Sequence, residues 1–467
     1  MKEMARHLPV VQAQDPATGL VKSSLRADGT REPVHPADVR GRFARARRAV
    51  FAVLIAIWAG LPWIQIGGHP AVFLDVQHRK FFLFGATFNA QDLWLLFFLL
   101  TGLGFSLVFL TAVAGRVFCG WACPQTVFLE GIFRPIERLI EGPREVRIKR
   151  NAGKWTRDKI VRKVAKHAIY VVAAVFVSHV FLAYFVSLPG LFGMVLGPPT
   201  EHLEAFLWMV GTSAIFYFDF AHFREQTCLG ICPYGRMQSV LMDEHSLVVG
   251  YDVNRGEPRG KLNQKGAGDC IDCKRCVAVC PTGIDIRNGL QLDCIACTAC
   301  IDACDEIMDK IKRPRGLIRY DSLAGLAGQP RRFVRPRTIL LTVLLCVGVV
   351  VFGFAVTKRT DFEANLLRLP GAPYTVENDT VRNAFQIHLV NKRAEDAVFT
   401  ITPEAHEGAQ VVVPMKEVKL EGLRSTYVPI FVTMPKEKFS GDFVINVRVR
   451  RDGGRERVYS GKFLGPS

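Results

Sequence analysis

Long apolar runs separated by polar segments are the first pattern along this chain. Five runs are long enough to cross the hydrocarbon core of a bilayer as helices. They cover residues 49–66, 93–114, 168–191, 203–220 and 338–356. The pattern therefore predicts an α-helical bundle of five transmembrane helices, the first four within a region of residues 49–248.

Lys and Arg are distributed unevenly among the polar segments. They precede the first and fifth runs and crowd residues 115–167, whereas residues 192–202 contain none and 67–92 contain only Arg79 and Lys80. Because cytoplasmic loops carry an excess of these residues, we expect the basic segments inside and the C-terminus outside. Residues 1–48 are polar and contain no signal-peptide h-region, so we expect a flexible cytoplasmic tail there.

The last stretch, residues 360–467, changes to short alternating strands. Segments such as AFQIHLVN, AQVVVP and DFVINVRVR are separated by Gly, Pro, Asn and Asp. The strand number and length predict an all-β, immunoglobulin-like sandwich without a disulfide, and the five spans place it outside the membrane. It contains no acid–base or nucleophile constellation; we expect His388 and His406 to be ordinary surface residues and the domain to bind a partner.

Composition supports a membrane protein. Hydrophobic residues make up 49% of the 467-residue chain and the mean hydropathy is +0.18, yet the net charge is +17. Apolar and basic residues must therefore be segregated. Since the basic residues flank the apolar runs, they argue for membrane lipid as the partner and against nucleic acid.

The cysteines carry the strongest chemical signal. Residues 270–304 contain the run CxxCxxCxxxC twice, the spacing of bacterial two-cluster ferredoxins, in which the fourth cysteine binds the other cluster. This predicts two 4Fe–4S clusters in a cytoplasmic ferredoxin domain, residues 249–330. Zinc ribbons do not repeat this spacing. Asp305 stands where the second run would have proline, which affects only the loop. The first cluster is assigned Cys270, Cys273, Cys276 and Cys304, and the second Cys280, Cys294, Cys297 and Cys300.

Two further cysteine pairs form an internal repeat. After the second and fourth apolar runs the chain reads CxxxCP, with Cys119 and Cys123 in the first copy and Cys228 and Cys232 in the second. Both copies should lie on the cytoplasmic side, where a pseudo-two-fold axis would bring four thiols together, and each proline suits a break or restart of a helix. Such cysteines could bind Cu(I), could ligate a further iron–sulfur cluster, or could cycle between dithiol and disulfide. The alternative is that all four are small buried residues at helix ends.

Several other polar groups lie near these motifs. His179 lies within the third run, and Asp219 and His222 end the fourth; we expect a polar contact within the bundle for His179 rather than haem ligation. Arg116 and Arg236 flank the two CxxxCP copies, where a cation would favour thiolate or anchor a helix end. Cys346, alone in the fifth run, is expected to pack against core or lipid.

The strings GRVFCGWACPQTVFLEG, CLGICPYGRMQSVL and QLDCIACTACIDACDEIMDKIKRPRGLIRY, in this order and followed by one span and a β domain, resemble the cytochrome c oxidase accessory protein family (CcoG, also called FixG or RdxA). The likeness begins near residue 40. It implies an inner-membrane polyferredoxin that reduces Cu(II) to Cu(I) for assembly of cbb-type oxidase. Implied partners are a cytoplasmic electron donor and oxidase subunits or copper chaperones and transporters.

Combined with that likeness, the motifs suggest one mechanism: electrons enter at the clusters and leave through the four CxxxCP cysteines, where a copper ion is held transiently. Two other classes of function stay open at this point. One is a quinol-linked membrane relay to a periplasmic reductase system, and the other is a non-catalytic scaffold for oxidase assembly.

Overall fold

The computed structural model describes residues 33–89, 92–262, 264–358, 360–393, 395–404, 406–454 and 456–466, with only the backbone for Leu93. The chain forms two compact units. The first contains the described residues up to Phe73 together with Phe98–Val350, and the second contains Leu74–Phe97 together with the chain from Val351 onward.

Five helices are long and apolar enough to cross a membrane, at Arg42–Trp63, Trp94–Ala114, Arg157–Val186, Leu203–Phe223 and Pro336–Thr357. Their regular parts are α1 (Arg42–Gly60), α2 (Leu93–Ala114), α7 (Arg157–Val186), α9 (Leu203–Phe218) and α15 (Pro336–Thr357). Many of their large hydrophobic side chains are exposed, as expected for helices that face lipid. The five predicted spans are thus present as helices.

Two helices begin before the predicted spans, for the same reason. The structure begins α1 at Arg42 instead of 49 and α7 at Arg157 instead of 168. Arg and Lys are good helix formers, so both helices extend through basic residues that the hydropathy pattern reads as loop. Helix α7 ends before 191, because Ser187 adopts a left-handed φ of 69° just ahead of Pro189.

The predicted flexible tail also needs correction. Residues 1–32 lie outside the described residues, but residues 33–48 pack against the rest of the first unit. The Ala37 amide donates to the Ala278 carbonyl at 2.8 Å, and the Arg275 side chain donates to the Asp38 carbonyl at 2.7 Å. A short polar segment that packs by backbone hydrogen bonds leaves no hydrophobic pattern in the sequence.

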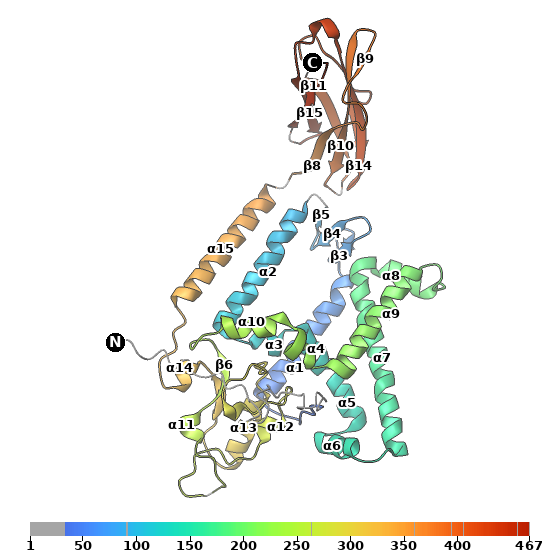
Figure 1. Cartoon of the computed structure of the whole chain (residues 1–467). Helices are drawn as coiled ribbons and strands as arrows, with labels where there is room; N and C mark the ends of the chain where they lie inside the picture. The colour runs from blue at the N-terminus through green and yellow to red at the C-terminus, as the bar shows by residue number, and fades with distance from the viewer. Residues whose placement is uncertain are drawn as a thin grey trace. The chain divides into compact units, whose positions relative to one another are not determined.

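Helices α7 and α9 lie side by side in the first unit (Figure 1), where the Ser178 hydroxyl contacts Thr212 and the Met209 carbonyl. Tyr184 donates to the Trp58 carbonyl and so joins α7 to α1. The shorter helical segments of this unit are α3 (Val117–Trp121), α4 (Pro124–Phe128), α5 (Arg134–Glu141), α6 (Arg144–Ala152), α8 (Leu188–Leu196) and α10 (Pro233–Leu241), with π-helical turns η3 (Leu129–Phe133), η4 (Asp219–Phe223) and η5 (Thr227–Ile231).

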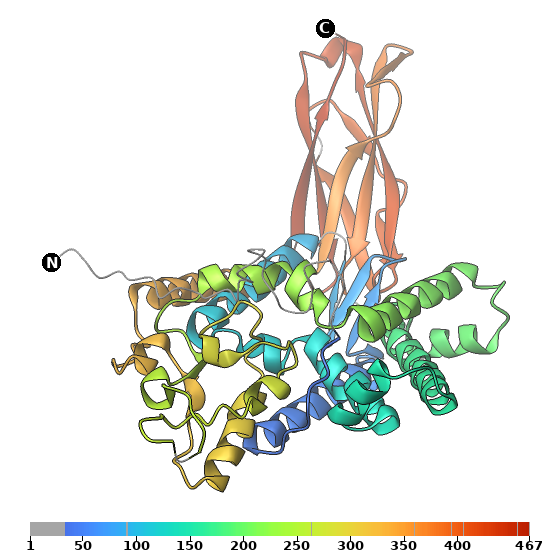
Figure 2. The same ribbon diagram turned by 60° about the horizontal axis from the view of Figure 1, so that its bottom comes forward.

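The ferredoxin part of the first unit is built on one short antiparallel pair, β6 (Val248–Tyr251) with β7 (Ile318–Asp321). Between these strands lie α11 (Val253–Gly256), α12 (Arg275–Ala278), the 3-10 turn η6 (Ile286–Asn288) and α13 (Ala299–Lys310), and α14 (Leu323–Leu326) follows β7. Its buried core includes Val249, Ile301 and Met308 together with several cysteines. The turned view in Figure 2 shows this part beside the start of α1.

The second unit contains the predicted sandwich. One sheet has the order β12-β14-β10-β8, with β9 on β10, and the other has the order β13-β11-β15-β16. Alternate residues of β10, including Phe385, Ile387 and Leu389, are buried between the sheets. The strands are β8 (Phe362–Arg368), β9 (Thr375–Glu377), β10 (Thr380–Asn391), β11 (Ala397–Glu404), β12 (Gln410–Val412), β13 (Glu417–Leu420), β14 (Ser425–Pro435), β15 (Phe443–Arg451) and β16 (Glu456–Phe463).

A buried ion pair joins this sandwich to the start of α2 within the second unit. Lys392 Nζ lies 3.0 Å from Asp92 Oδ1 and 2.9 Å from Glu363 Oε2. The small strands β4 (Lys80–Leu83) and β5 (Ala86–Phe88) pair in the same unit, next to β3 (Val72–Asp75), whereas β1 (Gln65–Ile66) and β2 (His69–Pro70) pair in the first. On the sandwich, His388 stacks on Tyr427 and His406 on Phe443.

Candidate iron–sulfur and thiol sites

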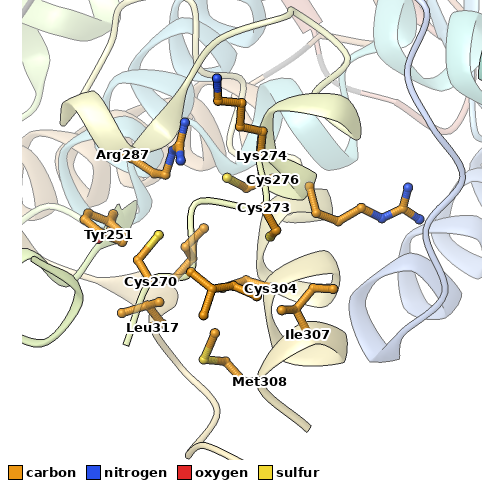
Figure 3. Close-up of a pocket in the computed structure, with 13 residues that line it drawn as sticks. Tyr251, Cys270, Cys273, Lys274, Cys276, Arg287, Cys304, Ile307, Met308 and Leu317 are labelled. Atoms are coloured by element: carbon orange, nitrogen blue, oxygen red, sulfur yellow. The ribbon is translucent and has the colours of Figure 1, made fainter. Parts of the chain in front are cut away.

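The first cavity, of about 360 Å³, is lined by Cys270, Cys273, Cys276 and Cys304, the set that the sequence predicts for one cluster. Figure 3 shows these four cysteines around the space, with Met308 and Leu317 in the apolar wall. Cys270 and Cys276 are buried, but Cys273 is exposed. One edge of this site therefore faces solvent.

The second cavity, of about 340 Å³, is lined by Cys280, Cys294, Cys297 and Cys300, with Cys276 at its border. These four cysteines are the set predicted for the other cluster. None of the four is exposed, and Ile284, Ile286 and Ile295 complete the lining. The structure thus brings each predicted set together, with the fourth cysteine exchanged between the two runs.

Both ligand loops share one backbone pattern. Asp272 and Lys274 flank the middle cysteine of the first run with φ of 50° and 54°, and Ala296 and Thr298 flank the middle cysteine of the second with φ of 51° and 65°. Left-handed backbone is uncommon in residues other than glycine and clusters at functional sites. The repeated pair of such residues turns each loop around its cysteines.

The thiol chemistry fits iron–sulfur clusters. Burial raises the pKa of Cys276, Cys294 and Cys304 to about 12 and that of Cys297 to about 11. The protein alone thus favours neutral thiols, and iron would supply the positive charge that holds them as thiolate ligands. Within the described ranges, no three His, Cys, Asp or Glu side chains are grouped around a single ion position. Thiols spread around a cavity suit a polynuclear cluster.

Each CxxxCP motif breaks one helix and starts another. Cys123 and Cys232 have extended backbone, and Pro124 and Pro233 open α4 and α10. Proline suits the first helical turn because it has no N–H to satisfy and disfavours helix in the residue before it. The predicted break is confirmed in both copies. The preceding turns differ, because Cys119 lies on α3 and Cys228 in the π-helical turn η5.

The two CxxxCP copies meet. Gln238 of α10 donates from Nε2 to the Cys119 sulfur at 3.1 Å, and Phe118 packs edge-on against Tyr234 at 6.0 Å. Burial raises the pKa of Cys228 to about 12, and the nearby thiols of Cys119, Cys123 and Cys232 contribute. Burial likewise raises the pKa of Cys119 to about 11 against the opposing effects of Gln238 and Arg116. The four thiols therefore share one electrostatic environment.

The loop of the second cavity packs directly on α3. A Cβ atom on Gly120 would lie 2.5 Å from the Ile295 carbonyl oxygen, so only glycine fits this approach. Arg116 NH1 donates to the Cys294 carbonyl at 3.3 Å. Trp121 Nε1 donates to the Tyr320 hydroxyl at 3.1 Å, which donates to the Ala296 carbonyl at 2.9 Å. The second cavity is thus adjacent to the first CxxxCP copy.

Helix α1 enters the same region. The amides of Phe43 and Ala44 donate to the Asp302 carboxylate of α13, at 3.3 and 2.7 Å, so a residue between two cluster cysteines caps α1. Arg47 Nε donates to the Gly120 carbonyl at 2.8 Å. Sequence reasoning missed both contacts, because they join residues more than 70 positions apart.

Sequence reasoning also missed a buried charge network in the first unit. Glu137 pairs with Arg224 at 2.8 Å and with Arg147 at 3.2 Å. Burial alone would raise the pKa of Glu137, but Arg224, Lys166 and Arg147 outweigh it and lower that pKa to about 2. The excess of basic residues was interpreted only as a topology signal, although some of them neutralise buried carboxylates.

The other polar residues named from the sequence, and Cys346, differ in their surroundings. His179 contacts the Val175 carbonyl of its own helix at 2.8 Å instead of a neighbouring helix. Asp219 accepts from Thr227, and His222 stacks on His167. Burial raises the pKa of Cys119 and Cys294, and Arg116 opposes that rise at both thiols, whereas Arg236 is exposed. Cys346 is also exposed, on α15.

Comparison with known proteins adds three family matches. Residues 94–143 match a "4Fe-4S binding domain", residues 223–323 a "4Fe-4S dicluster domain" and residues 352–466 an "IG-like fold at C-terminal of FixG". The dicluster match covers both cavities and the second CxxxCP copy. The match over 94–143 contains only the first CxxxCP copy.

Similar whole proteins also exist. The chain is 36% identical to "Nitrogen fixation protein FixG" of Rhizobium meliloti over 88% of either chain. It is 35% identical to "Protein RdxA" of Cereibacter sphaeroides over 91% of this chain and 95% of the relative. The crystal structure of a FixG-related protein from Vibrio parahaemolyticus aligns over 23% of this chain and all of that chain, with 11% identity and a TM-score of 0.22.

Proposed function

This chain belongs to the FixG/RdxA family of iron–sulfur proteins, and on that premise we propose that it passes electrons from its two cluster sites to copper, reducing Cu(II) to Cu(I) at the CxxxCP cysteines. The resemblance found from the sequence motifs is therefore confirmed. The copper chemistry and its purpose, delivery of Cu(I) during cbb-type oxidase assembly, are the proposal.

The observation that carries the proposal is the packing of the second cavity on α3. The loop from Cys294 to Cys297 contacts Gly120, the residue next to Cys119. In the first cavity, Cys273 is exposed. A one-electron donor has access to the first site, and the second site abuts the candidate acceptor. This arrangement supports an ordered path from one to the other.

The two sets of cluster cysteines and the CxxxCP cysteines would have separate roles. Each set of four cysteines would hold one 4Fe–4S cluster, which when bound supplies a one-electron carrier. Reduction of Cu(II) to Cu(I) needs one electron, which a reduced donor protein would supply by way of these sites. No covalent bond has to form or break. Cys119, Cys123, Cys228 and Cys232 offer soft sulfur ligands that favour the Cu(I) product. Gln238 fixes the Cys119 sulfur by its hydrogen bond.

The same proposal includes sidedness. The basic segments that flank the helices favour a cytoplasmic ferredoxin part and a β domain on the periplasmic side of the inner membrane. The β domain would then bind oxidase subunits or copper chaperones and transporters, and the electron donor would come from the cytoplasm.

The proposal is tested with anaerobically reduced full-length protein. One equivalent of Cu(II) is added and Cu(I) is followed with a specific chelator, for the wild type and for the variant with all four CxxxCP cysteines changed to serine. We expect stoichiometric Cu(I) from the wild type and none above background from the variant, with both retaining their clusters. Equal copper reduction by the two proteins would overturn the proposal.

A second function of the CxxxCP cysteines is favoured by the 4Fe–4S match over residues 94–143. In this alternative the four thiols ligate a third cluster. Iron analysis separates the two: about eight irons per chain fit two clusters and about twelve fit three. The four-serine variant should lose iron only under the alternative.

A further inference from the structure

Two arginines approach the second cavity from different helical elements. Arg116, which precedes α3, is 6% exposed and donates to the carbonyls of Cys294 and Gly235, each at 3.3 Å. Arg47 of α1 donates to the Gly120 carbonyl at 2.8 Å, and its guanidinium lies over Phe51. Neither arginine has a carboxylate within ion-pair distance among the described residues.

Each of these arginines also keeps one buried N–H without a hydrogen-bond partner, Arg47 NH2 and Arg116 Nε. Burying a charged donor unpaired is unfavourable unless a nearby group compensates. The anion-forming neighbours are cluster cysteines. Arg116 donates to the Cys294 carbonyl, and Arg47 donates to the carbonyl of Gly120, which packs on Ile295 of the same loop. The uncompensated cations therefore face the position at which thiolate ligands of the second cluster would carry negative charge.

The first cavity is different. Its nearest buried cation, Arg287, is already paired, with Asp272 at 2.5 Å and with Asp285 at 2.6 Å. Lys274 and Arg275 border this cavity too. Lys274 is exposed, and Arg275 is half-buried and donates to the Asp38 carbonyl at 2.7 Å, so solvent and salt screen both charges more than that of the buried Arg116. The two sites thus differ in the positive charge that remains free to act on them.

We propose that Arg47 and Arg116 hold the reduction potential of the second cluster above that of the first. An electron that enters near Cys273 would then reside mainly on the second cluster, beside the CxxxCP cysteines. Reduction adds one negative charge to a cluster, and an unpaired buried cation stabilises the reduced form more than the oxidised form. With both clusters bound, the electron gained by the second would be the one given up by the first, so no further reductant would be needed. This inference rests on the proposed electron path but not on copper as its end.

The test is an anaerobic redox titration of the purified full-length protein, followed by EPR. The wild type is compared with Arg47→Gln, Arg116→Gln, the corresponding Lys variants and Arg382→Gln, which removes an exposed charge from the β domain. The signals are assigned with Cys273→Ser and Cys297→Ser. Iron is measured for every variant.

We expect each Gln substitution to move the potential of the second cluster to a more negative value while that of the first stays in place. In half-reduced protein, the electron should then shift from the second signal to the first. The Lys variants, which keep the charge, should largely restore the wild-type potential, and Arg382→Gln should leave both unchanged.

Unchanged potentials in iron-replete Gln variants would overturn the inference. If a Gln variant loses iron, the Lys variants provide the test. If the arginines act only in folding, the Lys variants regain iron without necessarily regaining the difference between the potentials of the two clusters. Equal potentials of the two clusters in the Lys variants and the wild type contradict the inference. The titration contains no copper, so its failure is distinct from failure of copper reduction.

Discussion

The two cluster sites have the same ligand spacing and loop conformation but opposite surroundings. The first has an exposed cysteine, Cys273, and a cation, Arg287, that is neutralised by two carboxylates. The second has no exposed cysteine, packs on α3 through Gly120 and faces two arginines without carboxylate partners. A duplicated ferredoxin motif has therefore been differentiated by what packs around it, which suits one site for receiving electrons and the other for passing them on.

The largest effect should come from removing one ligand at each site. Cys297→Ser should abolish the second cluster signal and all transfer to the CxxxCP cysteines. Cys273→Ser should abolish the first signal and reduction by a donor protein, but small reductants should still load the second site. EPR and copper reduction by each variant check this. Identical behaviour of the two variants would remove the distinction between the sites.

The next largest effect concerns the buried charge network around Glu137. Glu137→Gln leaves Arg224 and Arg147 short of a buried anion, and breaking such a pair typically costs about 3–5 kcal/mol. Asp272→Asn, at the first site, removes a half-exposed carboxylate and leaves Arg287 paired with Asp285, so its cost should be smaller. Denaturant unfolding in detergent measures both. A smaller loss for Glu137→Gln than for Asp272→Asn would contradict the comparison.

The same carboxylate predicts a pH dependence. The pKa of Glu137 is lowered from 4.5 to about 2 in the folded chain, so its stabilising contribution is complete above pH 4.5. It is lost as the pH falls from there through about 2. Across that range, the free energy of unfolding should fall more steeply with decreasing pH for the wild type than for Glu137→Gln. Equal pH dependence of the two proteins would exclude this carboxylate as the cause.

A smaller effect is expected for Gly120→Ala. The added Cβ would clash with the Ile295 and Ala296 backbone, at a cost of about 1–3 kcal/mol for overpacking, and would move α3 from the cluster loop. We expect slower reoxidation of the second cluster by Cu(II) with unchanged iron content. Gly230→Ala, in the other CxxxCP copy, is the matched control, because nothing lies within 4 Å of its Cβ position. Equal rates for the two variants would show that the close approach is unimportant.

The smallest effect should follow Asp302→Ala. It removes the acceptor for the amides of Phe43 and Ala44, and loss of a helix cap typically costs about 0.5–2 kcal/mol. Because Asp302 lies between cluster cysteines, iron content should be measured together with unfolding. Stability equal to that of the wild type would show that the cap does not hold α1 on the ferredoxin part.

The sequence predicted what local pattern determines. Hydropathy located the five long helices, period-two alternation located the sandwich, and cysteine spacing selected the four cysteines that line each cavity. It also predicted that Pro124 and Pro233 restart helices. It did not show that α1 and α7 begin before the apolar runs, because hydropathy cannot distinguish a basic loop from a basic helical extension.

Contacts between distant segments could not be predicted from the sequence. The approach of Gly120 to Ile295, the capping of α1 by Asp302 and the partners of Glu137 depend on how remote segments pack. A single buried Gln on a helix, such as Gln238, gives no motif. These are also the contacts that distinguish the second cluster site from the first.

The order of cluster oxidation tests the central claim most directly. Fully reduced protein is mixed anaerobically with one equivalent of Cu(II) and freeze-quenched at increasing times, and the two EPR signals are followed separately. The account predicts that the second cluster, beside α3, is the first to be oxidised and is then refilled from the first. Earlier loss of the signal of the first cluster, with its exposed Cys273, would show that copper takes electrons at that edge and would contradict the proposed path.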